Sequence, residues 1–169
     1  MTKQALYEFF ADLVAYILER EYGNAAPAIF RAGQNRERPS AVYVVLDDGV
    51  ATAKHGRASE QVVLDKDGNP SFQYDNDYVE TITLWEVNSH GENLQTIIDY
   101  LDDEDVRAML FSAGVGILKP GTVNKTNWIA TEMIQALEYR VQIEVSVRSR
   151  RVSTGTYIEQ VEWTKEINH

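Results

Sequence analysis

The chain has 169 residues, of which 44% are hydrophobic, and it carries a formal net charge of −10. This length and composition predict one folded domain covering residues 1–169 and exclude general disorder. The absence of cysteine excludes disulfides, thiolate chemistry and cysteine-rich zinc sites, and the acidic balance argues against tight non-specific binding of nucleic acid.

The first predicted element is a helix over residues 5–22, in which apolar side chains recur at helical spacing. Thr2 is suited to cap its amino terminus, and Gly23 lies where a left-handed residue ends many helices. The chain enters this helix without the basic and apolar regions of a leader, and no apolar run is long enough to span a bilayer. We therefore expect neither a signal peptide nor a membrane contact.

A connector and a series of strands are predicted next. The connector covers residues 25–39 and contains a short extended piece at 29–32 and a polar cluster at 34–38. Strands are expected at residues 41–46, 59–64, 72–74 and 78–87, separated by a flexible loop at 49–56 and a turn at 65–70.

Two short helices and a further set of strands complete the pattern. Ser89 and Glu92 match a capping box that would begin the first of these helices, and Asp102 or Asp103 is suited to cap the second, which Gly114 ends. Extended segments are expected at residues 115–118, 127–133 and 157–163.

The most regular element is a strand over residues 136–148, in which apolar and polar side chains alternate. The apolar set is Leu137, Tyr139, Val141, Ile143, Val145 and Val147. A period of two places this set on one face of a sheet. The order of the elements then predicts an α+β fold, with a mainly antiparallel β-sheet, an N-terminal helix and a central helix pair packed on one face.

No stretch has the pattern of a catalytic or ligand site. The acidic turn at residues 65–69 has its glycine too early for a calcium loop, and the acidic run at 102–105 suits a helix start. The three histidines, His55, His90 and His169, are scattered, and the glycine-rich stretch at 114–121 lacks the ending of a P-loop. We therefore predict a protein that is not an enzyme and has no catalytic residues, no metal and no cofactor.

Aromatic and basic residues are the more suggestive features. Trp85, Trp128 and Trp163 all fall in expected strands, where they suit either a core or an interface between copies. Residues 148–156 form a basic segment in an acidic chain, which is typical of either an exposed hairpin tip or a loop that docks on an acidic neighbour.

Four segments, taken in order, resemble the bacteriophage tail-terminator, or neck-terminator, family of virion proteins. They are residues 29–35 with Pro39 and 42–45, residues 78–89 with 91–93, residues 110–117, and residues 138–140 with the alternating strand and 157–161. Together they span most of the chain, and the resemblance depends on their order more than on any one motif.

The resemblance implies a homo-oligomeric ring, usually of six copies, in the virion between the tail tube and the neck, assembled in the host cytoplasm. Its partners would be other copies of itself, the tail tube protein and a neck, head-completion or portal-side protein, with DNA passing through the lumen without sequence-specific binding. The candidate assembly contacts are polar residues in expected loops: Gln34, Asn35, Arg36, Arg38, Lys54, Arg57, Arg148, Arg150 and Arg151.

Three other classes of protein remain open. A different head–tail completion protein or a tail-tube component shares such small α+β units, since sequence does not decide whether a head-to-tail contact closes into a ring. An acidic protein that mimics DNA would need its carboxylates arranged like phosphates on one face, whereas here they are spread over turns and helix caps. A small hydrolase is disfavoured because no nucleophile motif is present.

Overall fold

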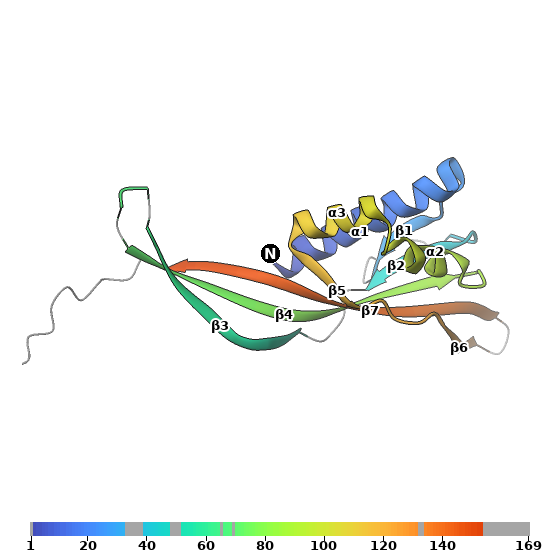
Figure 1. Cartoon of the computed structure of the whole chain (residues 1–169). Coiled ribbons are helices and arrows are strands. Elements are labelled where there is room, and N and C mark those ends of the chain that lie inside the picture. Colours follow the sequence, from blue (N-terminus) through green and yellow to red (C-terminus); the bar gives the residue numbers. More distant parts are fainter. Residues whose placement is uncertain are drawn as a thin grey trace, which may run out of the picture.

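Seven strands form one sheet, and three α-helices lie together on one of its faces in the computed structural model (Figure 1). The structure describes residues 2–32, 39–47, 52–64, 66–68, 70–131 and 134–153, and in parts of the long strands it describes the backbone only. The helices are α1 (Lys3–Tyr22), α2 (Glu92–Tyr100) and α3 (Glu104–Ala113), with a 3-10 turn η1 (Gly23–Ala25). The strands are β1 (Ala28–Arg31), β2 (Tyr43–Asp47), β3 (Thr52–Leu64), β4 (Pro70–Val87), β5 (Val115–Lys119), β6 (Asn124–Thr131) and β7 (Ile134–Ser153).

The sheet is built around the pairing of β4 with β7. These two strands run antiparallel from Phe72 opposite Ser153 to Val87 opposite Glu138. The strand order is β1-β2-β4-β7-β5, with β3 on β4 and β6 on β7. Only β1 and β2 pair in parallel among the described strands, so the predicted α+β fold with a mainly antiparallel sheet is confirmed.

The core lies between the helices and one face of the sheet. Alternate residues of β4 and β7 are buried there, and two of the polar residues between them in β7, Gln142 and Arg148, are exposed. The buried set from these two strands is Ile82, Leu84, Val141, Ile143, Val145 and Val147. Leu6, Phe10, Leu13, Val14, Ile17 and Leu18 of α1 pack against it. The predicted alternation is therefore confirmed over this part of β7, because a period of two matches a sheet covered on one side.

Most of the predicted helix ends are confirmed. The Thr2 hydroxyl accepts a hydrogen bond from the Ala5 amide at 3.2 Å, and Gly23, at φ +54°, ends α1. Asp103 caps α3 through the Asp105 amide at 3.0 Å, and Gly114 ends that helix in the left-handed region.

The predicted capping box at the start of α2 is wrong. The residue at the N-cap is Gly91, at φ +86°, and one amide in the first turn of the helix is satisfied from β4 instead. A carboxylate oxygen of Glu86 accepts a hydrogen bond from the Leu94 amide at 3.0 Å. Gly91 suits this position because a Cβ there would lie 2.8 Å from Cδ1 of Tyr139. The cap therefore comes from a residue on the sheet, outside the four-residue window that a capping box covers.

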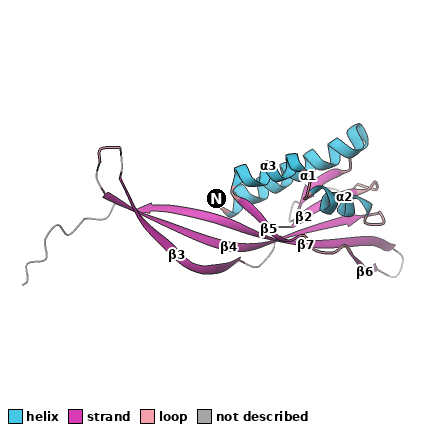
Figure 2. Ribbon diagram, in the orientation of Figure 1, coloured by secondary structure: helices cyan, strands magenta, loops and turns pink. Residues whose placement is uncertain are grey.

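The predictions of two loops are also wrong, because strands occupy much of these segments. Residues 52–56 of the predicted loop belong to β3, which begins at Thr52, and residues 148–153 of the predicted hairpin tip continue β7. The separate strands expected at 72–74 and 78–87 form one strand, β4, so that all three strands extend well past the helices (Figure 2). The polar cluster at 34–38 and the strand predicted at 157–163 lie outside the described residues.

Candidate assembly surface

The most prominent feature of the molecule is a three-stranded extension, here called the β-arm. It consists of β3, residues 70–80 of β4 and residues 148–153 of β7, and most of it projects beyond the helices on the side away from α2 (Figure 1). β4 lies in the middle, since it pairs with β3 on one side and with β7 on the other. The strands remain extended here because their backbone hydrogen bonds are made with one another.

Five of the nine predicted contact residues lie on the β-arm. Lys54 and Arg57 are in β3, and Arg148, Arg150 and Arg151 are in β7. They were expected in loops, and this part of the prediction is wrong. The other four, Gln34, Asn35, Arg36 and Arg38, lie outside the described residues.

The register brings acidic residues of β4 between these basic ones. Asp77 pairs with His55 on one side and with Arg148 on the other, and Asp75 pairs with Arg150. Arg148 Nε lies 3.2 Å from Oδ1 of Asp77, and both side chains are about half exposed or more, at 62% and 48%. An exposed ion pair of this kind contributes only about 0–1 kcal/mol to the stability of the fold. The surface of the arm therefore remains available for other contacts.

The outer edge of β3 carries exposed apolar side chains. Val62 and Leu64 are 63% and 70% exposed, near the end of the arm. Within the described residues β3 pairs only with β4, and a bulge between His55 and Ser59 separates the basic part of the strand from this apolar part. Unpaired backbone groups next to exposed apolar side chains are typical of a surface that accepts another strand. The sequence predicted a strand at 59–64, but its position at the edge follows from the pairing alone.

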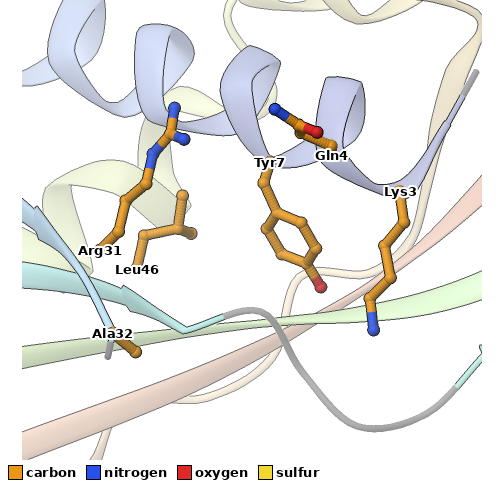
Figure 3. A pocket seen from close by; sticks show the side chains of 6 residues that line it. All are labelled: Lys3, Gln4, Tyr7, Arg31, Ala32 and Leu46. Atoms are coloured by element: carbon orange, nitrogen blue, oxygen red, sulfur yellow. The ribbon is translucent and has the colours of Figure 1, made fainter. Parts of the chain in front are cut away.

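A second candidate surface is a cavity at the start of α1, between that helix and the ends of β1 and β2. Its volume is about 340 Å³, and its lining residues are Lys3, Gln4, Tyr7, Arg31, Ala32 and Leu46 (Figure 3). Lys3 and Tyr7 point from α1 towards the sheet, with the Lys3 ammonium 5.9 Å from the centre of the Tyr7 ring. Arg31 extends from β1 towards the helix.

Two cations beside a helix amino terminus favour an anionic group in this cavity. The cavity borders Ala32, directly before the polar connector that was predicted to make assembly contacts. Sequence analysis missed it because Lys3 and Arg31 are far apart in the chain and are brought together by the packing of α1 on the sheet.

A third polar cluster joins the end of α1 to the start of α3. Arg20 Nη1 lies 3.0 Å from Oδ1 of Asp103 and 3.2 Å from Oδ2 of Asp105, and its guanidinium stacks 5.4 Å from the centre of the Tyr100 ring. The Tyr100 hydroxyl donates a hydrogen bond to Glu21 at 2.7 Å, which raises the pKa of Tyr100.

The same cluster lowers the pKa of an acidic residue, Asp103. Desolvation acts to raise the pKa of Asp103, but hydrogen bonds from the Asp105 amide and from Arg20 outweigh it and hold the pKa below its usual value. The polar groups of this cluster satisfy one another's hydrogen bonds and charges at the ends of two helices. The cluster therefore positions α3 on α1, and it does not resemble a set of reacting groups.

The sheet face away from the helices carries a stacked pair. The guanidinium of Arg140 lies 4.9 Å from the centre of the Trp85 ring, and the two residues face each other across β7 and β4. Both are partly exposed. Trp85 is thus the one predicted tryptophan whose side chain the structure describes, and it lies on the sheet face opposite the core.

Chemistry of other kinds is not evident in the described part of the chain. Among the residues that the structure describes, no group of three or more histidine or acidic side chains is placed to hold a metal ion. None of the described helices is both long and apolar enough to cross a membrane.

The fold and its surfaces define an α+β domain with a projecting β-arm. A scan of the chain against models of protein families finds no match, and a search of curated proteins finds no significant relative.

Proposed function

We propose that this chain is a structural virion protein, a tail terminator that forms a ring of six copies at the end of a phage tail tube. The ring would stop the growth of the tube and join it to the neck, with DNA passing through its lumen. The role requires no catalysis. The formal net charge of −10 suits a lumen that does not hold DNA by its phosphates.

The observation that carries the proposal is the β-arm. A three-stranded sheet without helical cover has little core of its own, and such sheets are stabilised by further packing. The arm presents the edge of β3 together with the exposed side chains of Val62 and Leu64. A domain that offers an uncovered arm beside a well-packed body is suited to make head-to-tail contacts with copies of itself.

The resemblance supports the same proposal through the positions of its segments. Residues 42–45 fall largely on β2, residues 78–89 lead from β4 towards α2, residues 110–117 join α3 to β5, and residues 138–140 lie in β7. Residues 78–89 and 110–117 are passages between the sheet and the helical layer, and residues 42–45 and 138–140 lie within the sheet. Their order along the chain therefore corresponds to one continuous body and not to scattered surface matches.

The test is assembly of the full chain. Light scattering after size exclusion, followed by electron microscopy, is expected to reveal closed rings, either in solution or after addition of purified tail tubes. Particles assembled without the protein are expected to have tails of uncontrolled length. A chain that stays monomeric on tail tubes, combined with normal tail length in its absence, would overturn the proposal.

The same images separate the neighbouring classes. Open filaments of the purified chain would indicate a tube component, because a contact that does not close propagates. A monomer that competes with DNA for a basic protein would indicate a DNA mimic instead.

A further inference from the structure

We propose that the C-terminal segment of one copy, residues 154–169, adds as an extra strand to the outer edge of β3 in a neighbouring copy. This inference deepens the proposed function, on which it rests, by naming the contact that joins successive subunits. The occupant of the edge is thus a second copy of the same chain.

The receiving surface is the regular part of β3 beyond its bulge. From Ser59 to Leu64 the strand pairs without interruption with β4, and its other side has no partner strand in the described part of the chain. Val62 and Leu64 are among the few large apolar side chains that are mostly exposed. An added strand would satisfy the open backbone groups of β3 and cover these side chains at once.

The segment that would occupy this surface leaves the described structure in the right place. β7 ends at Ser153, which pairs with Phe72 of β4, and on its other side Phe72 pairs with Val62 of β3. The last sixteen residues, 154–169, therefore start at the end of the arm and not on the helical body.

The composition of the segment suits an added strand. Residues 157–163 are rich in aromatic and β-branched types, namely Tyr157, Ile158, Val161 and Trp163.

Pairing with β3 of the same molecule is opposed by distance. The outer edge of β3 is separated from β7 by β4 and β3 themselves, which places an added strand roughly 14 Å from β7 at about 4.8 Å per strand. The link between Ser153 and Tyr157 spans at most about 14 Å when fully extended. It would have to cross a face of the arm in a straight line, with no length left to turn into register.

Folding back along β7 of the same molecule is opposed in part by occupancy. A return turn near Gly155 would bring Val161 level with residues 148–149 and Trp163 level with residues 146–147. In the described part of the chain, this edge of β7 is open at residues 148–153 and is taken from Val147 towards its start, where Val115 of β5 pairs with Val147. Trp163 would then lie without a strand partner, whereas the neighbouring β3 offers Val62 and Leu64.

The consequence is a head-to-tail contact with two different surfaces. Each copy gives its C-terminal segment to one neighbour and receives a segment on β3 from the other. Contacts of this kind close into a ring when the rotation between copies permits it. The segment thus acts as a strap between adjacent arms.

The chain has no cysteine, so single engineered cysteines report this contact without background. One set of full-length chains carries a cysteine at each position from Ser59 to Leu64 in turn, for example Val62→Cys. A second full-length chain carries Val161→Cys. The two are mixed and mildly oxidised, and dimers of the two different chains are separated from monomers on non-reducing gels, the two being distinguished by a size tag.

The matched control places the first cysteine at Ser112→Cys, an exposed position on α3 outside the arm. We expect disulfide yields with Val161→Cys on β3 to exceed this control about tenfold, with maxima at alternate positions, because disulfides require Cβ atoms within about 4.5 Å. Yields on β3 equal to the Ser112 control would overturn the proposal. Efficient closure within one chain carrying both Arg150→Cys and Ile158→Cys would overturn it in favour of a hairpin on β7.

Light scattering on the same samples separates this inference from the proposed function. Closed rings without crosslinks on β3 would contradict the proposed contact between the C-terminal segment and β3, and they would still support a ring. Crosslinks on β3 in open polymers would uphold the strap and contradict a ring terminator.

Discussion

The side chain of Glu86 in β4 caps the helix that follows it, with its Oε2 atom 3.0 Å from the backbone nitrogen of Leu94. Its other oxygen accepts a hydrogen bond from the side-chain amide of Asn93 at 2.7 Å. Glu86 is fully buried, on the sheet face that packs against the helices. The carboxylate therefore joins the sheet to α2 and fixes the direction in which that helix leaves β4.

Replacing Glu86 is expected to destabilise the domain because buried donors lose their acceptor. Glu86→Ala should lower the free energy of unfolding by about 2–4 kcal/mol, and Glu86→Gln by less, since its amide oxygen can still accept one of the two bonds. Urea unfolding measures both. Glu92→Gln, at an exposed position in the first turn of α2, is the control and should change stability by no more than about 0.5 kcal/mol. Equal losses at positions 86 and 92 would contradict the capping role.

The glycine at position 121 is expected to be irreplaceable for a reason that the glycine at 68 does not share. Both have positive φ, +83° and +82°, but a Cβ on Gly121 would overlap the Gln142 carbonyl of β7, whereas nothing lies within 4 Å of one on Gly68.

Gly68→Ala should therefore cost only the backbone strain, about 1–2 kcal/mol. Gly121→Ala should cost at least about 2 kcal/mol more, because the chain before β6 must move away from β7. The denaturant midpoints of the two variants, compared with that of the parent, measure this difference. A difference near zero would mean that this close approach is relieved without cost.

The cluster at the ends of α1 and α3 should make stability depend on acid pH. The pKa of Asp103 is lowered in the folded protein, so its contribution is present above the ordinary aspartate pKa of about 3.9 and is lost as pH falls through the folded value. Asp103→Asn should thus be less stable than the parent at pH 7, and the gap should narrow below about pH 4.

Urea midpoints measured across that range give the comparison. Thr2→Ala serves as the control, because it removes a hydrogen bond between a hydroxyl and the Ala5 amide and no group that titrates. Its gap from the parent should stay constant over the acid range. An Asp103→Asn gap that is equally constant would show that the carboxylate adds nothing.

The exposed apolar side chains of the β-arm should matter for assembly and not for folding. Val62→Thr combined with Leu64→Ser should change the free energy of unfolding of the monomer by no more than about 0.5 kcal/mol, since both side chains are mostly exposed. The concentration needed for half assembly should rise about tenfold, equivalent to about 1.4 kcal/mol of lost apolar burial.

Analytical ultracentrifugation over a concentration series measures this shift. Leu118→Ser on β5 is the control, because its side chain is 54% exposed but lies outside the arm. If the arm variant and the Leu118 variant weaken assembly equally, the arm is not a specific part of the interface.

Several elements follow from signals that are local in the sequence. The alternation around Ile143 specified a strand with one covered face, and Thr2, Asp103 and Gly114 specified helix ends, because each of these effects acts within a few residues of the chain. The α+β class followed from the order of these elements.

The ends of the strands, and the hydrogen bonds between residues far apart in the chain, depend instead on how the sheet is assembled. Residues 52–56 and 148–153 are rich in polar side chains, yet they are strands because β4 supplies their backbone partners. Glu86 replaces Ser89 as the cap of α2 for the same reason, since the geometry of the sheet, and not spacing along the chain, brings its carboxylate to the Leu94 amide. Hydrogen bonds between strands join residues far apart in sequence, so the β-arm and its open edge exist only once the sheet has formed.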